Sequence, residues 1–287
     1  MSAARPPEGA HTVAEGEGAP VRAARPPEGT HTAAEGEGTP ASAAADNARQ
    51  GAVLVTGASR GIGRAVAARL MADGLQVINY DIVPPAAPGA RETFVPVDLA
   101  DERALRAALA RTVAEQPVTR LVNNAGVVRP ATIDAVTSAD LQAVMAVNVA
   151  AAIICVQALL PAMRAARFGR IVNISSRAAL GKAERIAYAA SKAAVHGYTR
   201  ALALELAADG ITVNAIGPGP IATELFERVN PPGAPATQRI LDTIPLRRMG
   251  HPDDIAHQVA SLLDARAGFT TGQVLYVCGG MTVGLAP

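Results

Sequence analysis

Short apolar segments alternate with longer helical segments from Gly51 to the C-terminus, and this alternation allows few folds. Because apolar residues run continuously through the short segments, strands there are expected to be buried on both faces of a sheet. Strands separated by helices in this way form a parallel, doubly wound α/β sheet of about seven strands with right-handed crossovers. Strands are expected at Ala52–Thr56, Gln76–Tyr80, Phe94–Val97, Arg120–Asn123, Arg170–Ile174, Ile211–Ile216 and Gln273–Val277, and helices at Ile62–Asp73, Asp101–Ala114, Thr137–Ala166, Arg185–Ala208 and Pro252–Leu263.

Residues 1–50 differ in composition from the rest of the chain. They contain no aromatic residue, and the segment Ala3–Pro20 returns with few changes as Ala23–Pro40. Such a segment cannot bury enough apolar surface to offset the entropy of ordering it, so we expect a disordered, low-complexity tail. Residues 51–287 are then expected to form one domain. Gly and Pro cluster over residues 217–249, where we expect a lid over the substrate.

Charge and cysteine usage exclude several classes of function. Lys and Arg number 26 against 25 Asp and Glu, and no basic stripe interleaved with aromatic residues indicates a nucleic-acid partner. No apolar run is expected to span a membrane and no secretory signal is recognised, so a cytoplasmic location is expected. Cys155 and Cys278 lie far apart, which excludes a disulfide framework and a CxxC metal site; no metal is expected.

A glycine-rich turn joins the first expected strand to the first expected helix. It reads Thr-Gly-Ala-Ser-Arg-Gly-Ile-Gly over residues 56–63. A pyrophosphate must approach the backbone closely and meet the unpaired N–H groups of a helix N-terminus, and side chains at the glycine positions would block it. The turn therefore predicts a dinucleotide site, although glycine spacing alone also fits an ordinary turn.

An acidic residue, Asp81, closes the second expected strand, 24 residues after Gly57 (81 minus 57). A dinucleotide-binding unit places there the carboxylate that accepts hydrogen bonds from the adenosine ribose. A 2′-phosphate would be repelled by this charge, which favours NAD over NADP. Arg60 argues for the opposite preference, since it could pair with a 2′-phosphate, so NADP stays possible.

A tyrosine and a lysine, Tyr188 and Lys192, lie four residues apart in an expected helix and therefore on one face of it. Tyrosine is a poor base at neutral pH unless a nearby cation stabilises its phenolate, and Lys192 can supply that cation. Upstream, Ser175 and Ser176 end an expected strand, where a hydroxyl can donate a hydrogen bond to a substrate oxygen. Taken alone, the tyrosine–lysine pair would also fit a surface helix.

These motifs, in this order, resemble the short-chain dehydrogenase/reductase family: the glycine turn, NNAG at residues 123–126, the serine pair and YAASK at residues 188–192. The sequences GPGPIAT at 217–223 and VCGG at 277–280 extend the resemblance, which covers the chain from about Gly51 onward. It implies a single Rossmann-type domain, a nicotinamide cofactor and a homotetramer. Cys278 departs from the Asp that many members carry, and we expect this to change C-terminal packing.

The resemblance implies a role for each catalytic residue. Tyr188 is the general acid/base, Lys192 lowers its pKa and binds the nicotinamide ribose, and Asn148 holds a water in a proton relay. Ser175 has the usual family spacing to the tyrosine, 13 residues (188 minus 175), whereas the strand register favours Ser176. We expect Ser176 to be the catalytic serine, with a deletion in the following loop.

The resemblance also implies how the cofactor is held. Asp98 would contact the adenine, although it would also suit a helix N-cap, and the NNAG segment would wall the adenine side. Ile221 and Thr223 would hold the carboxamide end of the nicotinamide. The expected cofactor-binding residues are Gly57, Ser59, Arg60, Gly61, Ile62, Gly63, Asp81, Asp98, Leu99, Asn124, Ala125, Gly126, Tyr188, Lys192, Pro218, Gly219, Ile221 and Thr223.

The sequence thus predicts an NAD(P)-dependent oxidoreductase that moves hydride between nicotinamide and a carbonyl or secondary alcohol substrate. Two alternatives stay open at this point. One is an NADPH-dependent 3-oxoacyl reductase, and the other, from a different class, is a catalytically silent dinucleotide-binding scaffold or sensor. His196, which follows Lys192 by four residues, is expected to pack at a helix interface and not to join the relay.

Overall fold

A seven-stranded parallel sheet forms the centre of the protein, in the strand order β3-β2-β1-β4-β5-β6-β7. The computed structural model describes residues 51–231 and 233–283, so the expected tail and its repeat lie outside the described residues. The Rossmann-type α/β architecture expected from the alternating pattern is confirmed. The strands are β1 (Ala52–Thr56), β2 (Val77–Asp81), β3 (Glu92–Pro96), β4 (Val118–Asn123), β5 (Gly169–Ile174), β6 (Ile211–Pro218) and β7 (Val274–Val277).

The strand order reverses at β1, which pairs with β2 on one side and with β4 on the other. Connections leave β1 and β4 in opposite directions, so no helix crosses the carboxyl ends of these two strands. Ligands of open parallel sheets bind in the crevice at this switch point. The glycine turn at residues 56–63 and the NNAG segment follow β1 and β4 directly, so both lie at this edge.

Burial of the central strands agrees with their continuous apolar sequences. Every residue of β1, β4, β5 and β6 is buried, whereas the edge strands β3 and β7 are partly exposed. A strand covered by helices on both faces is mostly apolar, and its few polar side chains, such as Thr119, Asn173 and Asn214, are buried with it, whereas a half-exposed strand alternates in polarity.

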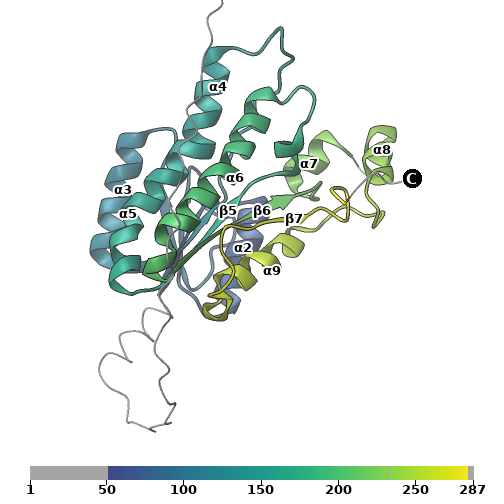
Figure 1. Cartoon of the computed structure of the whole chain (residues 1–287). Helices are drawn as coiled ribbons and strands as arrows, with labels where there is room; N and C mark the ends of the chain where they lie inside the picture. Colours follow the sequence, from purple (N-terminus) through teal and green to yellow (C-terminus); the bar gives the residue numbers. More distant parts are fainter. Residues whose placement is uncertain (1–50, 232, 284–287) are drawn as a thin grey trace, which may run out of the picture. The chain divides into compact units, whose positions relative to one another are not determined.

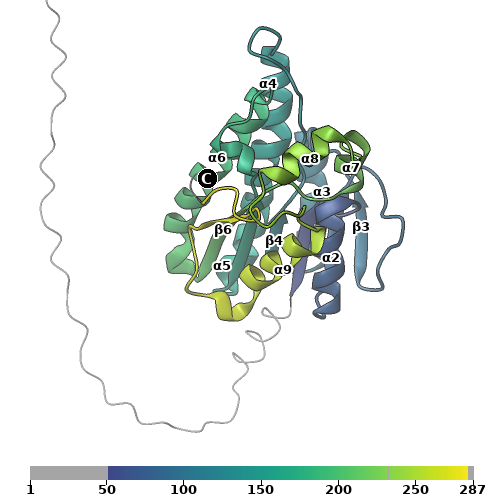
Figure 2. The ribbon, with the colours of Figure 1, turned by 90° about the vertical axis from the view of Figure 1, so that its right-hand side faces the viewer.

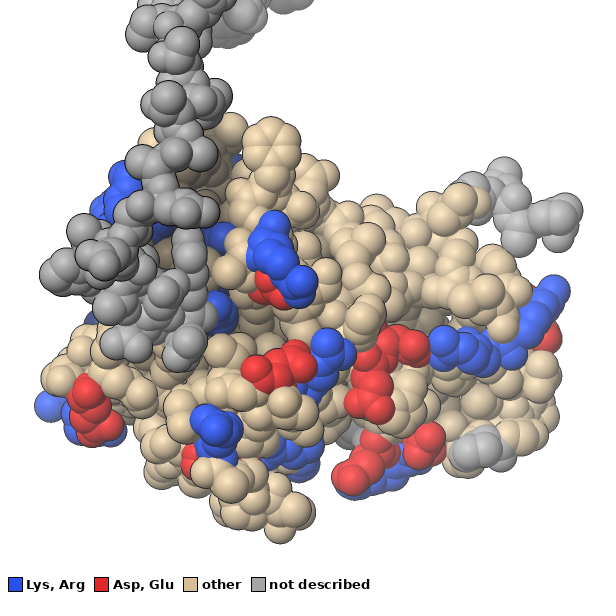
Figure 3. Space-filling model, turned by 90° about the horizontal axis from the view of Figure 1, so that it is seen from below, with Lys and Arg blue, Asp and Glu red and all other residues tan. Residues whose placement is uncertain are grey.

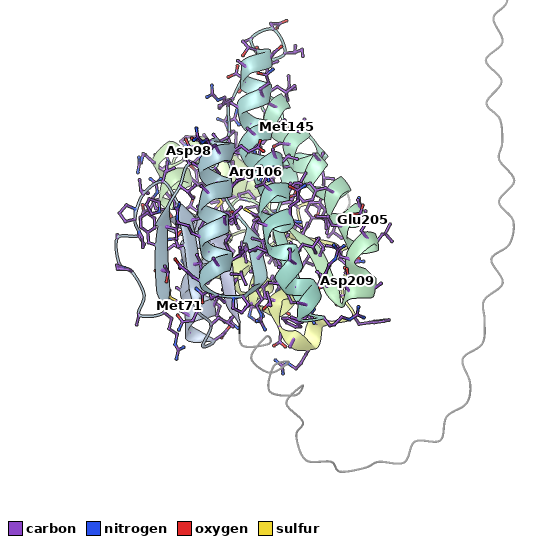
Figure 4. All side chains as sticks on the ribbon, turned by 90° about the vertical axis from the view of Figure 1, so that its left-hand side faces the viewer. Met71, Asp98, Arg106, Met145, Glu205 and Asp209 are labelled. Atoms are coloured by element: carbon purple, nitrogen blue, oxygen red, sulfur yellow. The ribbon has the colours of Figure 1, made fainter. Side chains whose placement is uncertain are left out.

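Helices cover both faces of the sheet (Figure 1). On one face α3, α5 and α6 lie side by side, and Figure 4 views this layer from outside, with Arg106 on α3 and Glu205 on α6 labelled. On the other face α2 packs against α9. Each layer buries its own apolar cluster against the sheet. The main helices are α2 (Gly61–Ala72), α3 (Glu102–Glu115), α4 (Ser138–Met145), α5 (Ala151–Ala165), α6 (Ile186–Leu206) and α9 (Pro252–Leu263).

The helix expected at Thr137–Ala166 contains a turn of π-helix that the apolar periodicity did not predict. It consists of α4, the π-helical turn η1 (Ala146–Ala150) and α5. The stretch Ser138–Ala165 is also long and apolar enough to cross a membrane, which corrects the expectation that no run reaches that length. An 18-residue window within this stretch has a mean hydropathy of 2.3. Half of that window is buried inside the fold, as in a core helix.

The segment expected to be a lid carries two short helices, α7 (Glu224–Val229) and α8 (Pro235–Asp242). Thr223 caps α7, since its hydroxyl oxygen accepts a hydrogen bond from the backbone N–H of Phe226. Figure 2 shows α7 and α8 above α9 in that view. Two backbone hydrogen bonds between Pro220–Ala222 and Gly250 close the base of this segment, so it leaves and rejoins the fold at one place.

Charges on the face of the molecule seen in Figure 3 are mixed. Acidic and basic side chains lie interspersed there, without a large area of one sign. Several of the ion pairs join groups that are more than a third exposed, such as Arg69 with Asp73 and Arg106 with Glu102. Pairs of this kind contribute little to stability.

Candidate active site

The glycine turn has the backbone geometry that a close approach requires. Gly57 and Gly61 have φ values of 69° and 55°, a region that side chains rarely adopt. A Cβ atom on Gly63 would lie 2.0 Å from the carbonyl oxygen of Gly57, so only glycine lets α2 start this close to β1. No side chain caps the N-terminus of α2, and its first N–H groups stay available for an anion.

Asn124 supports this turn from the neighbouring strand. Its side-chain nitrogen donates hydrogen bonds of 2.9 Å and 3.0 Å to the carbonyl oxygens of Thr56 and Gly57. The Thr56 hydroxyl oxygen accepts from the backbone N–H groups of Asn124 and Ala125. The NNAG segment therefore holds the end of β4 against the glycine turn, a structural role that the sequence interpretation did not include.

Asp81 lies at the end of β2 and contacts the glycine turn directly. One carboxylate oxygen accepts a 3.1 Å hydrogen bond from the backbone N–H of Ser59, and the other accepts one of 2.8 Å from Ile82. The Ser59 hydroxyl donates to the carbonyl oxygen of Val83. The carboxylate is thus fixed beside the turn, while the side chain of Arg60 is exposed.

Asp98 follows β3 at the same edge and is exposed, while Leu99 is buried beneath it. One carboxylate oxygen of Asp98 accepts from the backbone N–H of Ala100. Asp101, and not Asp98, caps α3, because its carboxylate accepts from the N–H of Ala104. The N-cap alternative for Asp98 is therefore wrong. Figure 4 shows Asp98 beyond the upper end of α3.

The segment that follows β6, where the expected lid starts, lies next to the glycine turn. A Cβ atom on Gly61 would lie 3.5 Å from a methyl carbon of Thr223, so these segments are neighbours. Gly219 is packed against Cys278, where a Cβ would lie 2.8 Å from the Cα atom. Ile221 is buried and Pro218 ends the strand. This arrangement joins four expected cofactor residues to the turn at β1.

Tyr188 lies in the first turn of α6, where the Ser176 hydroxyl is close enough to lower its pKa. Ser175 instead donates to the carbonyl oxygen of Lys192 at 2.9 Å and lies 2.8 Å from Nε2 of His196. Successive residues at the end of an extended strand point to opposite sides, which explains why only one serine reaches the tyrosine. The geometry favours Ser176 as the partner of Tyr188.

Lys192 is buried one turn further along α6. Its Nζ atom donates a 2.7 Å hydrogen bond to the carbonyl oxygen of Ile174 and lies 5.7 Å from the centroid of the Tyr188 ring. Burial lowers the pKa of Lys192 to about 8. A buried ammonium group without a carboxylate partner is costly, so it readily accepts a neighbouring negative charge.

The expectation that Lys192 lowers the pKa of Tyr188 is not met by this geometry. Burial raises the pKa of Tyr188 above its ordinary value, and the hydrogen bond from Ser176 is what opposes this rise. The Lys192 ammonium group points to the Ile174 carbonyl instead of the phenol oxygen. Any stabilisation of the phenolate by Lys192 thus requires a shift of that side chain or of its hydrogen bond.

Asn148 occupies the π-helical turn, and protein groups engage both ends of its amide. Its nitrogen donates to the carbonyl oxygen of Val127 and to the Ser191 hydroxyl, and its oxygen accepts from the N–H of Val127. The Ser191 hydroxyl in turn donates to the carbonyl oxygen of Tyr188. The side chain thus connects the loop after β4 to α6. The expected role of Asn148 in holding a water stays a prediction.

The described residues suit a dinucleotide. A cradle that excludes side chains, an uncapped helix N-terminus and a carboxylate at the end of β2 lie in the order that phosphate and ribose groups require. No cluster of three or more His, Cys, Asp or Glu side chains within residues 51–231 and 233–283 is placed to hold a metal ion. Cys155 is buried among apolar groups, which raises its pKa to about 12 and makes it unreactive.

Three groups of this site were missed by the sequence interpretation: the Thr56 hydroxyl, the Ser191 hydroxyl and the Ile174 carbonyl. Ser191 and Thr56 are buried polar residues next to recognised motifs, and that position was the one signal available. A backbone carbonyl carries no sequence signal at all. These groups orient the recognised residues and do not replace them.

Comparison with known proteins agrees with this geometry. A family model described as enoyl-(acyl carrier protein) reductase matches residues 57–282. The acetoacetyl-CoA reductase of Shinella zoogloeoides is 40% identical over 237 residues, which are 79% of this chain and 96% of that protein. The 3-oxoacyl-(acyl-carrier-protein) reductase of Synechocystis sp. (strain ATCC 27184 / PCC 6803 / Kazusa) is 37% identical over 243 residues, with coverage of 80% and 96%.

A solved structure matches over the same region. It is that of a candidate NAD(P)-dependent gluconate 5-dehydrogenase from Beutenbergia cavernae with bound NADP at low occupancy. Its TM-score is 0.75 at 32% sequence identity, and the match covers 82% of this chain and 98% of that one. Nearly the whole length of these three proteins, 96% to 98%, is thus represented in this chain.

Proposed function

The chain belongs to the short-chain dehydrogenase/reductase family, and from this membership we propose that Tyr188 exchanges a proton with the oxygen of its substrate. The protein is an NAD(P)-dependent oxidoreductase that acts on CH–OH or C=O groups. The observation that carries the proposal is the placement of the buried Lys192, whose Nζ atom lies 5.7 Å from the centroid of the Tyr188 ring, at the carboxyl edge of the sheet with the Ser176 hydroxyl close to Tyr188.

In the proposed mechanism the nicotinamide dinucleotide supplies or accepts the hydride when it is bound. Gly57, Gly61 and Gly63 would leave room for its pyrophosphate against the N-terminus of α2, and Asp81 would accept hydrogen bonds from the adenosine ribose. Ile221 and Thr223 would position the carboxamide end of the nicotinamide. The remaining expected residues, Ser59, Arg60, Ile62, Asp98, Leu99, Asn124, Ala125, Gly126, Pro218 and Gly219, shape or support this surface.

Proton transfer is the task of the protein side chains. During reduction the Tyr188 hydroxyl donates its proton to the substrate oxygen as negative charge develops there, and the Ser176 hydroxyl donates a hydrogen bond to the same oxygen. Lys192 is buried and cationic below its pKa of about 8, and it stabilises the resulting phenolate once its ammonium group shifts from the Ile174 carbonyl toward the phenol oxygen. Asn148 holds α6 in place relative to the β4 loop. Oxidation follows the same steps in reverse.

NAD is the proposed cofactor. The Asp81 carboxylate is fixed beside the glycine turn, and a 2′-phosphate would lie close to this charge. Repulsion between like charges at about 4 Å costs roughly 1–4 kcal/mol near a surface, which favours NAD by about tenfold or more. The exposed Arg60 and the NADP-bound relative keep NADP as the second candidate.

A 3-oxoacyl thioester reductase is the second candidate function. Two relatives are named as reductases of acetoacetyl-CoA and of 3-oxoacyl-(acyl-carrier-protein). The match to this chain covers nearly the full length of each relative. A silent dinucleotide-binding scaffold is disfavoured, because a scaffold needs the glycine turn but not a tyrosine with a serine hydroxyl and a buried lysine beside it.

We also propose a homo-oligomer in the cytoplasm, and a tetramer by family membership. Large apolar side chains are exposed on α4, α6 and beside β7, including Leu141, Leu204 and Phe269. Scattered apolar residues are ordinary, but Leu204, which is 84% exposed on α6, suits a contact with a second copy through the helix layer seen in Figure 4. Light scattering of the purified chain tests this, and a monomeric mass would contradict it.

A cofactor-coupled screen tests the proposed function. The purified chain is mixed with NADH or NADPH and a panel of cyclic ketones, polyol-derived ketones, steroids and acetoacetyl-CoA, and the loss of nicotinamide absorbance is followed. We expect turnover with NADH for at least one ketone. Saturable binding of both nucleotides without turnover of any ketone or alcohol would support the scaffold instead.

A further inference from the structure

We propose that Arg177, Lys182 and Arg185 form a cationic subsite beside Ser176 and Tyr188 that binds a carboxylate or phosphate group of the substrate. The inference rests on the proposed function, because it names the chemical class of the substrate at that same site: a ketone or alcohol that carries an anionic group. The subsite residues all lie in the segment that joins the catalytic serine to the catalytic tyrosine.

The position of this segment places cations at the reaction site. Arg177 follows Ser176 directly and begins the short 3-10 helix η2 (Arg177–Leu180), which packs against α6. Arg185 is the N-cap residue of α6, three residues before Tyr188. Between the two catalytic residues there are three cations and one carboxylate, Glu184, which leaves a net charge of +2 (3 minus 1).

Arg177 is partly buried and has an unused donor. Its Nε atom is shielded from solvent and makes no hydrogen bond. A buried guanidinium N–H without a partner costs free energy, so such groups are nearly always hydrogen-bonded in native proteins. A planar guanidinium binds carboxylates and phosphates through two parallel hydrogen bonds, which makes an anion the natural partner.

Lys182 shows that the three cations influence one another. Its pKa is lowered, first by burial and then by the nearby charges of Arg185 and Arg177. The lowering means that the folded chain disfavours a full positive charge there as long as no negative group is close. An anion bound between these side chains would remove both penalties at once.

No carboxylate within residues 51–231 and 233–283 forms an ion pair with the subsite. Among the ion pairs of the described residues none includes Arg177, Lys182 or Arg185, whereas the nearby Arg129 is paired with Asp140 at 3.1 Å. Arg185 instead donates to the backbone carbonyl of Glu184, which also accepts from the N–H of Ala131. These bonds hold the loop in place without neutralising its charge.

Exposed apolar side chains lie on the same segment as the subsite and on the loop paired with it. Leu180 is 61% exposed and Ile186 is 40% exposed, and both belong to the same segment. Val128, on the loop that pairs with it through Ala131 and Arg185, is 45% exposed. A substrate with an apolar body and one negative end would contact both kinds of side chain, which a neutral hydrocarbon or a neutral sugar would not.

Matched substrates test the proposal, each pair sharing one reacting ketone. The first pair is acetoacetate and methyl acetoacetate, which differ by a carboxylate. The second is S-acetoacetyl-4′-phosphopantetheine and S-acetoacetylpantetheine, which differ by one phosphate. We expect the native chain to show a kcat/KM about tenfold higher for the charged member of at least one pair. Preference in the first pair alone assigns a carboxylate, and in the second alone a phosphate.

Variants connect that preference to the subsite. Arg177→Gln and Lys182→Gln should each lower the charged-to-neutral ratio about threefold to tenfold, while kcat for the neutral ketone stays within about twofold. Arg103→Gln, which removes an exposed cation on α3, should leave the ratio unchanged. Equal kcat/KM values for both members of both pairs, or ratios that the subsite variants do not alter, would overturn the proposal and leave the proposed function intact.

A binding measurement separates the two failures. If none of the four ketones is turned over, the proposed function fails, and the subsite is judged by thermal denaturation of the chain saturated with NAD. Acetoacetate or CoA should raise the melting temperature of the native chain and not that of the Arg177→Gln/Lys182→Gln double variant. An equal rise in both proteins, or no rise in either, would show that no anion binds at the subsite.

Discussion

The Nζ atom of Lys192 donates a 2.7 Å hydrogen bond to the carbonyl oxygen of Ile174, the last residue of β5. This bond fixes a buried cation at the carboxyl edge of the sheet, one turn from Tyr188. No carboxylate compensates it, and burial lowers its pKa to about 8. The protein thus accepts an unfavourable charge at the place where the proposed reaction generates a phenolate.

Lys192→Met should therefore raise stability at neutral pH while it abolishes turnover. The folded pKa of about 8 lies below the ordinary 10.5, so between these values the unfolded chain binds more protons and the stability of the native protein rises with pH. Below pH 8 the full penalty is present. The variant should be more stable by about 2 kcal/mol at pH 7, after the lost hydrogen bond is deducted.

Denaturant unfolding of both proteins at pH 7 and pH 10 checks this. The difference should shrink as the pH rises, because the native lysine loses its charge. A variant that is less stable than the native chain at pH 7 would show that Lys192 is not a strained cation.

Cofactor choice depends on the charge of Asp81. The native chain should use NADH with a kcat/KM at least about tenfold above that for NADPH. Asp81→Asn keeps an acceptor for the Ser59 N–H but removes the charge, so the ratio should fall by about tenfold. Asp98→Asn is the matched control, since both nucleotides share the adenine. A native preference for NADPH would refute the assignment of NAD.

The two serines should separate function from packing. Ser176→Ala should lower kcat by about 100-fold through loss of a hydrogen bond to the reacting oxygen, with little change in stability. Ser175→Ala removes a buried hydroxyl bonded to Lys192 and His196, so it should cost about 1–2 kcal/mol and change kcat less than about tenfold. Steady-state kinetics and thermal denaturation of both variants decide, and the opposite pattern would make Ser175 the catalytic serine.

Gly63→Ala should damage the cofactor site and the fold together. The added Cβ would lie 2.0 Å from the Gly57 oxygen and 2.5 Å from the Asn124 nitrogen, so α2 must move. We expect a loss of about 2–4 kcal/mol and nucleotide binding weakened at least about tenfold. Ala72→Gly, on the exposed side of the same helix, should cost about 1 kcal/mol with unchanged nucleotide affinity. Equal nucleotide dissociation constants for both variants would contradict this account of the turn.

The fold was largely predictable because burial on both faces gives the strands a simple apolar signature. The first strand was predicted with its observed bounds, Ala52–Thr56, and the other strand ends differ by a few residues at most. The π-helical turn at Ala146–Ala150 was not predictable, because it accompanies hydrogen bonds from Asn148 to Val127 and Ser191. Those partners come from distant parts of the chain, and apolar periodicity does not encode them.

The candidate site shows the same division. The spacing of Tyr188 and Lys192 on one helix follows from local geometry, whereas the choice between Ser175 and Ser176 does not, because residue counting and strand register gave different answers. The raised pKa of Tyr188 was also beyond the sequence, since it depends on burial and on where the lysine points. Local patterns thus identified the residues, and tertiary contacts determine what each one does.

Single-turnover kinetics of Tyr188→Phe tests the central claim most directly, with nucleotide affinity measured on the same protein. The substitution removes one hydroxyl and keeps the ring, so the dissociation constant for the nucleotide should change less than about threefold while the rate of hydride transfer falls by about 10²–10⁴ or more. A variant that binds the nucleotide normally and still reduces its ketone at a rate close to the native one would remove Tyr188 from the reaction.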